Sequence, residues 1–508
     1  MTVRASEQYL PASRKLMLLL AILLGGAVVI GAMAAQEPLF ALGGLVFVLL
    51  TVGMFIWPDG VTIFVLFVLY TNAAVVAVRF HGVPFIAGAA VPALLIFPFG
   101  YYLVFRHKEL VIDKIVPLMG VLLLVFVLGS LFAVDRDEAV ESVINFVIEG
   151  IALYVLIINT VRTPKLLRLA IWALVIAGLL MGGVSFYQQI TQTYDQNYGG
   201  FAQMSDAAFG TGEENLLGEV EQPRLGGPLG QQNRFAQIML MLVPLALFQF
   251  WGQRSKLLRL LAAVATGLIL TGAVLTFSRG AAVGFVLMLL TMAFMRYIKL
   301  HRLLIVLIAL VLLLQAFPQF SSRLDSLSVF SELISDDGTT ISSADGATRS
   351  RATEMLAAVL MFAEHPVIGV GPGMYPQHYQ EYATRVGIRV LRTTRESHSL
   401  PLGLAAEAGL LGLLALGSIL FLTLRDLNRH RRQFLKRSPE MAYIVTGLFL
   451  SIIVFLTTSL FLHFAYIRYF WLIMGLAGAT NHIAKNMLAT DVVPEIQPST
   501  ALTAPQTG

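Results

Sequence analysis

Long apolar runs, separated by short polar segments, cover most of the chain. A helix needs roughly 20 apolar residues to cross the hydrocarbon core of a membrane, and about fourteen runs come near that length. These runs lie near residues 16–35, 39–57, 61–79, 84–105, 115–133, 140–160, 167–190, 234–251, 257–276, 280–296, 302–318, 399–424, 441–463 and 466–484. The pattern predicts an all-α, polytopic integral membrane helix bundle with about 12–14 transmembrane helices and two extracytoplasmic loop segments.

Two of these runs are unusual. The run at 140–160 is the weakest of the set, because it contains Glu141, Asn145 and Glu149. The run at 84–105 contains three prolines, which is compatible with a broken or re-entrant helix. Apart from Glu149, ionisable residues are almost absent from the middle of the predicted spans.

Basic residues divide unequally between the two sides of this topology. When successive spans alternate in direction, 22 Lys and Arg residues fall on one side and 13 on the other. Because short loops rich in Lys and Arg face the cytoplasm, the first side is predicted to be cytoplasmic, with both termini. All eight lysines lie on that side, and every basic residue outside is arginine. Two explanations remain open: exported surfaces tolerate arginine, or planar guanidinium groups are needed there to bind phosphate bidentately.

The topology divides the chain into six segments. They are an N-terminal transmembrane bundle (1–190), a first extracytoplasmic loop (191–233), central transmembrane helices (234–318), an extracytoplasmic loop with an amphipathic helix (319–398), C-terminal transmembrane helices (399–484) and a cytoplasmic tail (485–508). The amphipathic helix is predicted from Arg349 to Glu364, because apolar residues, Leu356 and Val359 among them, recur there at helical spacing. Such a helix lies flat at the membrane interface or caps the bundle.

Composition narrows the class of protein. The chain is 57% apolar and 13% charged, whereas soluble domains carry about 25% charged residues. The net charge of +5 does not indicate nucleic-acid binding, because the basic residues lie mostly in short loops between spans. The chain has no cysteine, which excludes disulfides, thiolate metal sites and cysteine nucleophiles.

Four polar features lie on the predicted outer face, and the first two precede spans. In PRLGGPLGQQNRFAQ (223–237), Arg224 and Arg234 flank glycines whose backbone amides can approach an anion, with Asn233 in support. The alternative is an ordinary loop with turn glycines. In LTFSRGAAVGF (275–285), Arg279 lies at or just below the outer interface. It either faces a cavity or extends to the surface from a helix end.

The third feature is the start of the amphipathic helix and the turn that follows it. Arg349 and Arg351 lie where their charge opposes the helix dipole, so an external anion is a reasonable partner for one of them. Gly371 belongs to the GVGPG turn after the helix, and tight turns need glycine in any case.

The fourth feature is RESHSLPLGLAAEAGLLGLL (395–414), where a titratable cluster precedes an apolar run. Glu396 and Ser399 lie on either side of His398, and Glu396 is a candidate hydrogen-bond partner of the histidine. The alternative is a capped helix, in which Ser397 or Ser399 is the N-cap and the histidine is structural.

In this order and on one side of the membrane, RLGGPLGQQNRFA, LTFSRGAAVGF, EHPVIGVGPGMYPQHY and SHSLPLGLAAEAGLLGLL resemble motifs of a known family. It is the O-antigen ligase / O-antigen polymerase family of bacterial integral-membrane glycosyltransferases. The resemblance covers about residues 220–425 in motifs and the whole chain in hydropathy. It implies a GT-C-like bundle in the bacterial inner membrane, with the active site on the periplasmic, extracytoplasmic face.

The resemblance also implies a reaction. The donor is a glycan on undecaprenyl diphosphate, and neither a nucleotide sugar nor a metal ion nor another cofactor takes part. Ligases of the family transfer the glycan, with inversion, to a hydroxyl of a lipid A–core sugar or an equivalent acceptor. The expected partners are therefore this donor, a lipid or glycan acceptor and membrane lipids, and no nucleic acid.

Residue roles follow from the same resemblance. His398 matches the general base for the acceptor hydroxyl, Arg224 and Arg279 match the arginines that hold the diphosphate, and Arg351, or alternatively Arg349, matches the arginine of the loop helix. The family commonly has Asn after the histidine, where this chain has Ser399. The chemistry is coherent, because guanidinium groups stabilise charge on a departing diphosphate and the ordinary pKa of histidine lies near neutrality.

Two other functions remain open. A repeat-unit polymerase of O-antigen or exopolysaccharide uses the same donor and differs in its acceptor. A lipid-linked glycan flippase belongs to another class, and it requires polar groups at the membrane midplane, often on discontinuous helices in two related halves. The one-sided distribution of polar features favours an enzyme.

Overall fold

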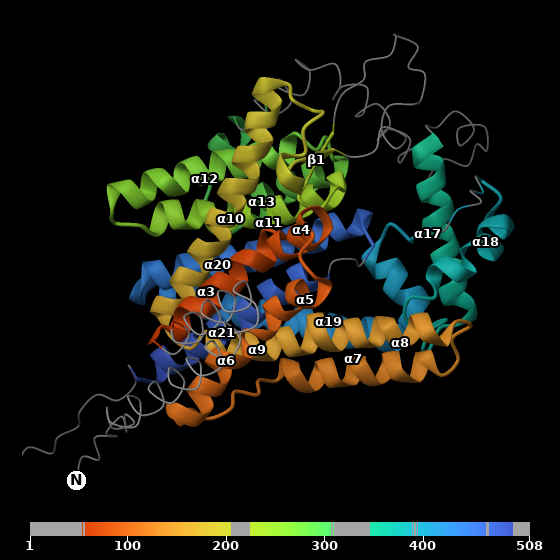
Figure 1. Cartoon of the computed structure of the whole chain (residues 1–508), viewed down its shortest axis with the longest axis horizontal. Coiled ribbons are helices and arrows are strands. Elements are labelled where there is room, and N and C mark those ends of the chain that lie inside the picture. The colour runs from red at the N-terminus through yellow and green to blue at the C-terminus, as the bar shows by residue number, and fades with distance from the viewer. Residues whose placement is uncertain are drawn as a thin grey trace, which may run out of the picture.

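A computed structural model describes residues 56–204, 224–305, 346–388, 395–463 and 467–490, with a few single positions beside them. The predicted spans at 16–35, 39–57 and 302–318 lie wholly or mostly outside these residues. Within the described part, seven helices are long and apolar enough to cross a membrane, or eight if one bent pair counts as a span. The all-α, polytopic bundle predicted from the sequence is confirmed, and the chain is a multi-pass membrane protein (Figure 1).

The described elements are almost entirely helical. In chain order they are α3 (Pro58–Tyr70), α4 (Ala73–His81), α5 (Phe85–Ala93), α6 (Ile96–Gly100), the π-helix η1 (Tyr101–Phe105), α7 (Ile115–Ser130), α8 (Arg136–Asn145), the π-helix η2 (Phe146–Ala152), α9 (Leu153–Thr160), α10 (Pro164–Thr191), the 3₁₀ turn η3 (Tyr198–Gly200), β1 (Gln203–Met204), β2 (Leu225–Gly227), α11 (Gln232–Gly252), α12 (Lys256–Val274), α13 (Arg279–Phe294), α17 (Gly346–Glu364), α18 (Tyr375–Val386), α19 (Leu400–Arg437), α20 (Pro439–Thr458), the 3₁₀ turn η6 (Ser459–Phe461) and α21 (Ile467–Thr490). The two short strands form one antiparallel pair.

Three predicted spans differ in detail from the observed helices. The span at 61–79 is bent by 61° between α3 and α4, where Asn72 has a left-handed backbone. The span at 140–160, the weakest in the sequence, is a continuous helical stretch from Arg136 to Thr160 that contains η2. The span at 399–424 continues to Arg437, because Leu427 and Phe434 extend a buried stripe along α19.

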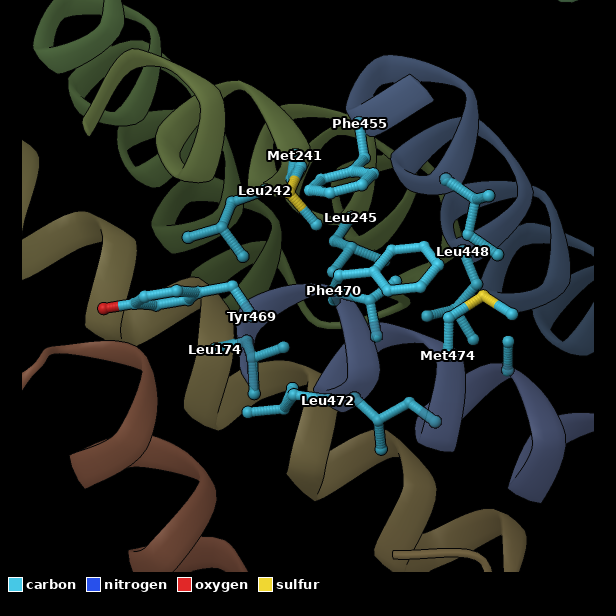
Figure 2. Packing of buried hydrophobic residues seen from close by; sticks show 14 of the residues in the cluster. Leu174, Met241, Leu242, Leu245, Leu448, Phe455, Tyr469, Phe470, Leu472 and Met474 are labelled. Atoms are coloured by element: carbon cyan, nitrogen blue, oxygen red, sulfur yellow. The ribbon is translucent and has the colours of Figure 1, made fainter. Parts of the chain in front are cut away.

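Helix α11 lies at the centre of the bundle. Its membrane-spanning window is 78% buried, compared with 28% for the neighbouring α12. Figure 2 shows Met241, Leu242 and Leu245 of α11 packed with side chains of α10, α20 and α21. Small residues allow the close contacts: a Cβ added at Gly182 of α10 would lie 2.2 Å from the Leu268 carbonyl oxygen of α12. Helix association in membranes depends on such packing.

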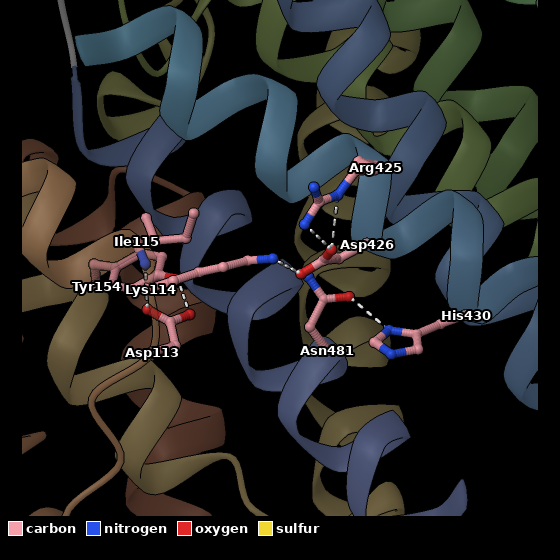
Figure 3. Close-up of polar contacts among 8 residues, drawn as sticks. All are labelled: Asp113, Lys114, Ile115, Tyr154, Arg425, Asp426, His430 and Asn481. Carbon is pink, nitrogen blue, oxygen red and sulfur yellow. Dashed lines mark hydrogen bonds and ion pairs between the residues drawn. The ribbon is translucent and has the colours of Figure 1, made fainter.

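Polar contacts join three helices at the end of α19 far from Leu400 (Figure 3). Lys114, just before α7, forms an ion pair with Asp426 of α19, and Arg425 lies 3.4 Å from the same carboxylate. Also on α19, His430 Nδ1 is 3.0 Å from Asn481 Oδ1 of α21. These contacts bring together segments that the distribution of Lys and Arg residues assigns to the same side of the membrane.

Helices α17 and α18 form an arm (346–388) at one end of the bundle, on the right in Figure 1. The arm is anchored where α19 is interrupted at Gly409, whose backbone angles (φ 61°, ψ −160°) are not helical. The interruption leaves backbone donors and acceptors without helical partners. Segment 366–371 of the arm bonds to them on both sides: Val370 N to Ala406 O (2.9 Å), Gly371 N to Glu407 O (3.0 Å), Leu410 N to Pro366 O (2.8 Å) and Leu411 N to Val367 O (3.2 Å).

Replacing Gly409 by alanine is expected to destabilise the protein by about 1–3 kcal/mol through the backbone conformation alone. The added Cβ would also lie 2.4 Å from the Val367 carbonyl, so segment 366–371 must move. Thermal unfolding of the detergent-solubilised protein measures the effect. Gly417→Ala on the same helix is the matched control, because nothing lies within 4 Å of its added Cβ. Equal melting temperatures for the two variants would contradict the prediction.

Candidate active site

His398 lies in the short segment between the arm and α19. Ser399 has the extended backbone of an N-cap, but its side chain makes no capping bond. Ser397 Oγ instead donates to the Ser399 carbonyl (2.9 Å). His398 has a left-handed backbone (φ 48°), which is uncommon for a residue other than glycine and is often found at functional sites. The local backbone therefore fixes the position of the ring.

The His398 ring is held through its Nδ1 atom. Nδ1 lies 3.0 Å from the Glu396 carbonyl oxygen, to which it is hydrogen-bonded, and 2.8 Å from Glu354 Oε2. A carbonyl oxygen can only accept, so Nδ1 must carry the proton. In the neutral ring Nε2 is then the unprotonated nitrogen, with a lone pair available to accept a proton. The side chain is 23% exposed, so it remains accessible.

Sequence reasoning named Glu396 as the partner of the histidine and missed Glu354. The Glu396 contact is made by the backbone carbonyl, and the carboxylate nearest the ring belongs to Glu354 on α17. Burial raises the pKa of the Glu396 carboxyl, while the charges of His398 and Arg234 act in the opposite direction. Glu354 Oε1 also lies 3.7 Å from Arg395 Nε.

The orientation of α17 explains why Glu354 was missed. Leu356 and Val359, which belong to its predicted apolar face, are 44% and 43% exposed. The opposite face, with Glu354, Ala357 and Ala358, is fully buried against the protein. Small residues there permit close packing, so the helix contacts the rest of the protein through a face other than the one that carries Leu356 and Val359. The signal available in the sequence was the spacing of Glu354, Ala357 and Ala358, which places all three on one face of a helix.

A second histidine, also missed, lies beside the first. His463 follows η6, and its ring centroid is 5.9 Å from that of His398, with an angle of 75° between the rings. Burial lowers the pKa of His463, and the nearby charges of Arg234 and His398 lower it further. Both effects favour the neutral form of the His463 ring. Its position at the outer end of a predicted span was the signal in the sequence.

Arg224 joins the first two sequence features. Its Nε donates to the Thr276 carbonyl (2.9 Å), and its Nη2 donates to the Phe277 carbonyl and to Asn233 Oδ1 (both 3.4 Å). The residue as a whole is 9% exposed. Arg224 thereby holds the segment that leads directly into Arg279, the first residue of α13. Both Nε and Nη2 are committed to protein groups in this arrangement.

The start of α13, which carries Arg279, and Arg234 of α11 belong to the same end of the bundle as the histidines. A Cβ on Gly280 would lie 3.4 Å from Phe461, so the start of α13 lies against η6, which precedes His463. Arg234, at the start of α11, is 2% exposed and acts electrostatically on both Glu396 and His463. Four helix ends therefore meet here, namely the N-terminal ends of α11, α13 and α19 and the C-terminal end of α20.

Three residues that the sequence predicted as part of the site lie on the arm. Arg349 Nη2 donates to the Ile388 carbonyl (3.1 Å) and so connects α17 to the end of α18. Arg351 lies on α17 one turn before Glu354 and is partly exposed. Gly371 (φ 109°) belongs to the segment that bonds to the interrupted α19, and a Cβ there would lie 3.1 Å from the Gly129 carbonyl of α7. A glycine is needed at this position so that the arm can pack against α7.

Ionisable residues also lie inside the described part of the bundle. Glu149 of η2 is 3.4 Å from Arg468 Nη1, and Arg468 also bonds to Asn72, whose amide donates to the Pro228 carbonyl of the glycine-rich loop (2.9 Å). The expectation that Glu149 is almost alone in the predicted spans overlooked Glu407. This residue of α19 accepts a bond from Tyr375 N (3.2 Å) and so helps to attach the arm.

The fold and the site together define a class: a multi-pass helical membrane protein that gathers histidine, arginine and glutamate where four helix ends meet. Residues 264–417 match the family model described as O-antigen ligase, which confirms the resemblance seen in the motifs. The matched stretch contains Arg279, Glu354 and His398, and Arg224 precedes it. No curated protein matches the chain significantly. The match supports an O-antigen ligase- or polymerase-type function, and with it a glycosyltransferase-like membrane enzyme.

Proposed function

We propose that the protein is an O-antigen ligase-type glycosyltransferase. It moves a glycan from undecaprenyl diphosphate to an acceptor hydroxyl, of a lipid A–core sugar or an equivalent, on the extracytoplasmic face. The observation that carries the proposal is the state of the His398 ring. Because Nδ1 donates to the Glu396 carbonyl, Nε2 is the nitrogen that can take a proton from a sugar hydroxyl.

The reaction is a single displacement at the anomeric carbon. His398 Nε2 takes the proton as the acceptor oxygen attacks, and the bond to the diphosphate breaks with its electron pair on the phosphate oxygen. Attack from the opposite face inverts the configuration. The positive ends of α11, α13 and α19, together with Arg279 and Arg234, stabilise the charge that grows on the leaving group. Guanidinium groups supply this charge without a metal ion.

Purified protein in proteoliposomes tests the function directly. The reactants are a synthetic undecaprenyl-diphosphate glycan and, as acceptor, either lipid A–core or a second lipid-linked glycan. A single attachment to lipid A–core supports the ligase. A ladder of lengths on the lipid-linked glycan would identify the polymerase instead. Movement of the intact donor across the bilayer without a new glycosidic bond would identify a flippase.

The membrane orientation is part of the proposal. The active site faces outward in the bacterial inner membrane, and both termini are cytoplasmic. The excess of Lys and Arg in the loops that include Lys114 and Arg425 supports this orientation. The division of the chain into six segments follows the same topology.

Cysteine labelling in intact cells is expected to report opposite sides for two positions. The chain has no cysteine of its own, so single variants give unambiguous signals. Thr393→Cys, an exposed position in the segment before His398, should react with a membrane-impermeant maleimide in spheroplasts. Gln433→Cys, exposed near the far end of α19, should react only after lysis. The reverse pattern would overturn the orientation.

A further inference from the structure

We propose that Glu354 is a positioning residue whose carboxylate is the counter-ion of the His398 ring when the ring takes up the proton of the acceptor. This inference rests on the proposed function and assigns a role to a residue outside the recognised motifs. The pairing uses atoms already in place: Glu354 Oε2 is 2.8 Å from Nδ1, and the side chain is 1% exposed.

The burial of Glu354 is difficult to explain by stability alone. Among the described residues, neither carboxylate oxygen has a hydrogen-bond donor in hydrogen-bonding geometry. A buried carboxylate without such donors is costly, because it has lost its water without an equivalent replacement. Arg395 at 3.7 Å and the His398 ring are the groups that offset its charge. An isosteric uncharged side chain would fit the same space at lower cost.

One group fixes the orientation of the His398 ring, and a second group supplies the negative charge next to it. The hydrogen bond from Nδ1 goes to the Glu396 carbonyl, so the backbone sets the tautomer. The Glu354 carboxylate contacts the same nitrogen electrostatically. When Nε2 gains the proton from the acceptor hydroxyl, the ring becomes positive, and a carboxylate at this distance favours the charged form.

Other charged and titratable groups lie around the His398 ring and its neighbours. His463 lies beside the ring, Arg395 contacts Glu354, Arg234 of α11 acts on Glu396 and His463, and Glu138 of α8 acts on Glu396. Glu396 contacts Nδ1 through its backbone carbonyl and not through its carboxylate. Glu354, on α17, is therefore the carboxylate that supports the protonated ring.

The position of Glu354 also makes the base dependent on the arm. The Glu354 carbonyl accepts a hydrogen bond from the Tyr375 hydroxyl (2.6 Å), which connects α17 to α18. Tyr375 N in turn donates to Glu407 of α19 (3.2 Å). The counter-ion is thus presented by an arm that is itself bonded to the helix that follows His398.

The test compares wild type, Glu354→Gln, Glu354→Asp, Glu364→Gln and His398→Ala in one transfer assay, with kcat and KM measured across pH. Glu354→Gln keeps the shape and removes the charge. It is expected to lower kcat roughly tenfold to a hundredfold, to leave the donor KM within about twofold, and to move the acid limb of kcat/KM to lower pH by about one unit. Glu354→Asp should keep the acid limb near its wild-type position, because the charge remains.

Glu364→Gln is the matched control, since Glu364 is an exposed glutamate on the same helix that pairs with Arg385. Wild-type kcat and an unchanged acid limb in Glu354→Gln would overturn the inference while the proposed function stands. Equal losses in the Gln and Asp variants with unmoved pH profiles would assign Glu354 a packing role and would also overturn it. Activity in His398→Ala would refute the base assignment itself. Melting temperature and elution volume identify any variant that fails to fold.

Discussion

Replacing His398 by alanine is expected to reduce glycan transfer by about 10²–10⁴-fold, the usual contribution of a general base. The acceptor hydroxyl then has no group to take its proton, while the arginines and helix ends that bind the donor remain. The loss should therefore fall on kcat, with a small change in the donor KM. Transfer by the reconstituted protein, measured at saturating donor and acceptor, gives the value.

His365→Ala is a suitable control for this variant. His365 lies on the same arm but is exposed, and it ends the helix that carries Glu354. It should retain wild-type transfer. If His398→Ala kept more than about a tenth of wild-type kcat, proton removal by this ring would not be part of the rate-limiting chemistry.

The helical content and the position of the site followed from simple physical signals. Apolar runs long enough to span a membrane define α10, α11 and α20, because the hydrocarbon core sets their length. Breaks in those runs located Arg279 and His398, since charged and titratable groups are costly inside a span. Glycine next to arginine drew attention to the loop that holds Arg224.

These local sequence patterns do not predict contacts between segments that are far apart in the chain. The interruption at Gly409 is stable only because segment 366–371 bonds to both sides of it, and nothing in the local apolar pattern around residue 409 indicates such a partner. Gly371, in this segment, has a positive φ and lies close to Gly129 of α7, which the sequence around it does not indicate either. Local sequence specifies a helix or a turn, but the partner of each depends on the fold.

Glu354 illustrates the same limit at the site itself. Helical periodicity assigns faces by apolar content, and on α17 the buried face combines small and polar residues, Glu354 among them, with a single large apolar residue, Met361. The larger apolar residues, Leu356 and Val359, remain on the exposed face. A membrane is a second apolar environment, so hydrophobicity does not identify the protein-facing side. Small-residue spacing is the better guide for helices of this kind.

Replacing Arg279 by alanine is expected to lower kcat by about 10²–10³-fold, the usual loss when one group that stabilises transition-state charge is removed. Arg279 is the first residue of α13, whose start lies against η6, so we expect its charge to act together with the positive end of that helix. Arg279→Lys should recover part of the rate, because an ammonium restores charge but not bidentate geometry. Arg385→Ala, which removes an exposed arginine of the arm, is the control.

Arg224→Ala should differ from Arg279→Ala by lowering the melting temperature as well, because Arg224 bonds the Thr276 and Phe277 carbonyls. A single-turnover assay of donor consumption separates the two effects, and equal rates for Arg279→Ala and Arg385→Ala would remove Arg279 from the diphosphate site.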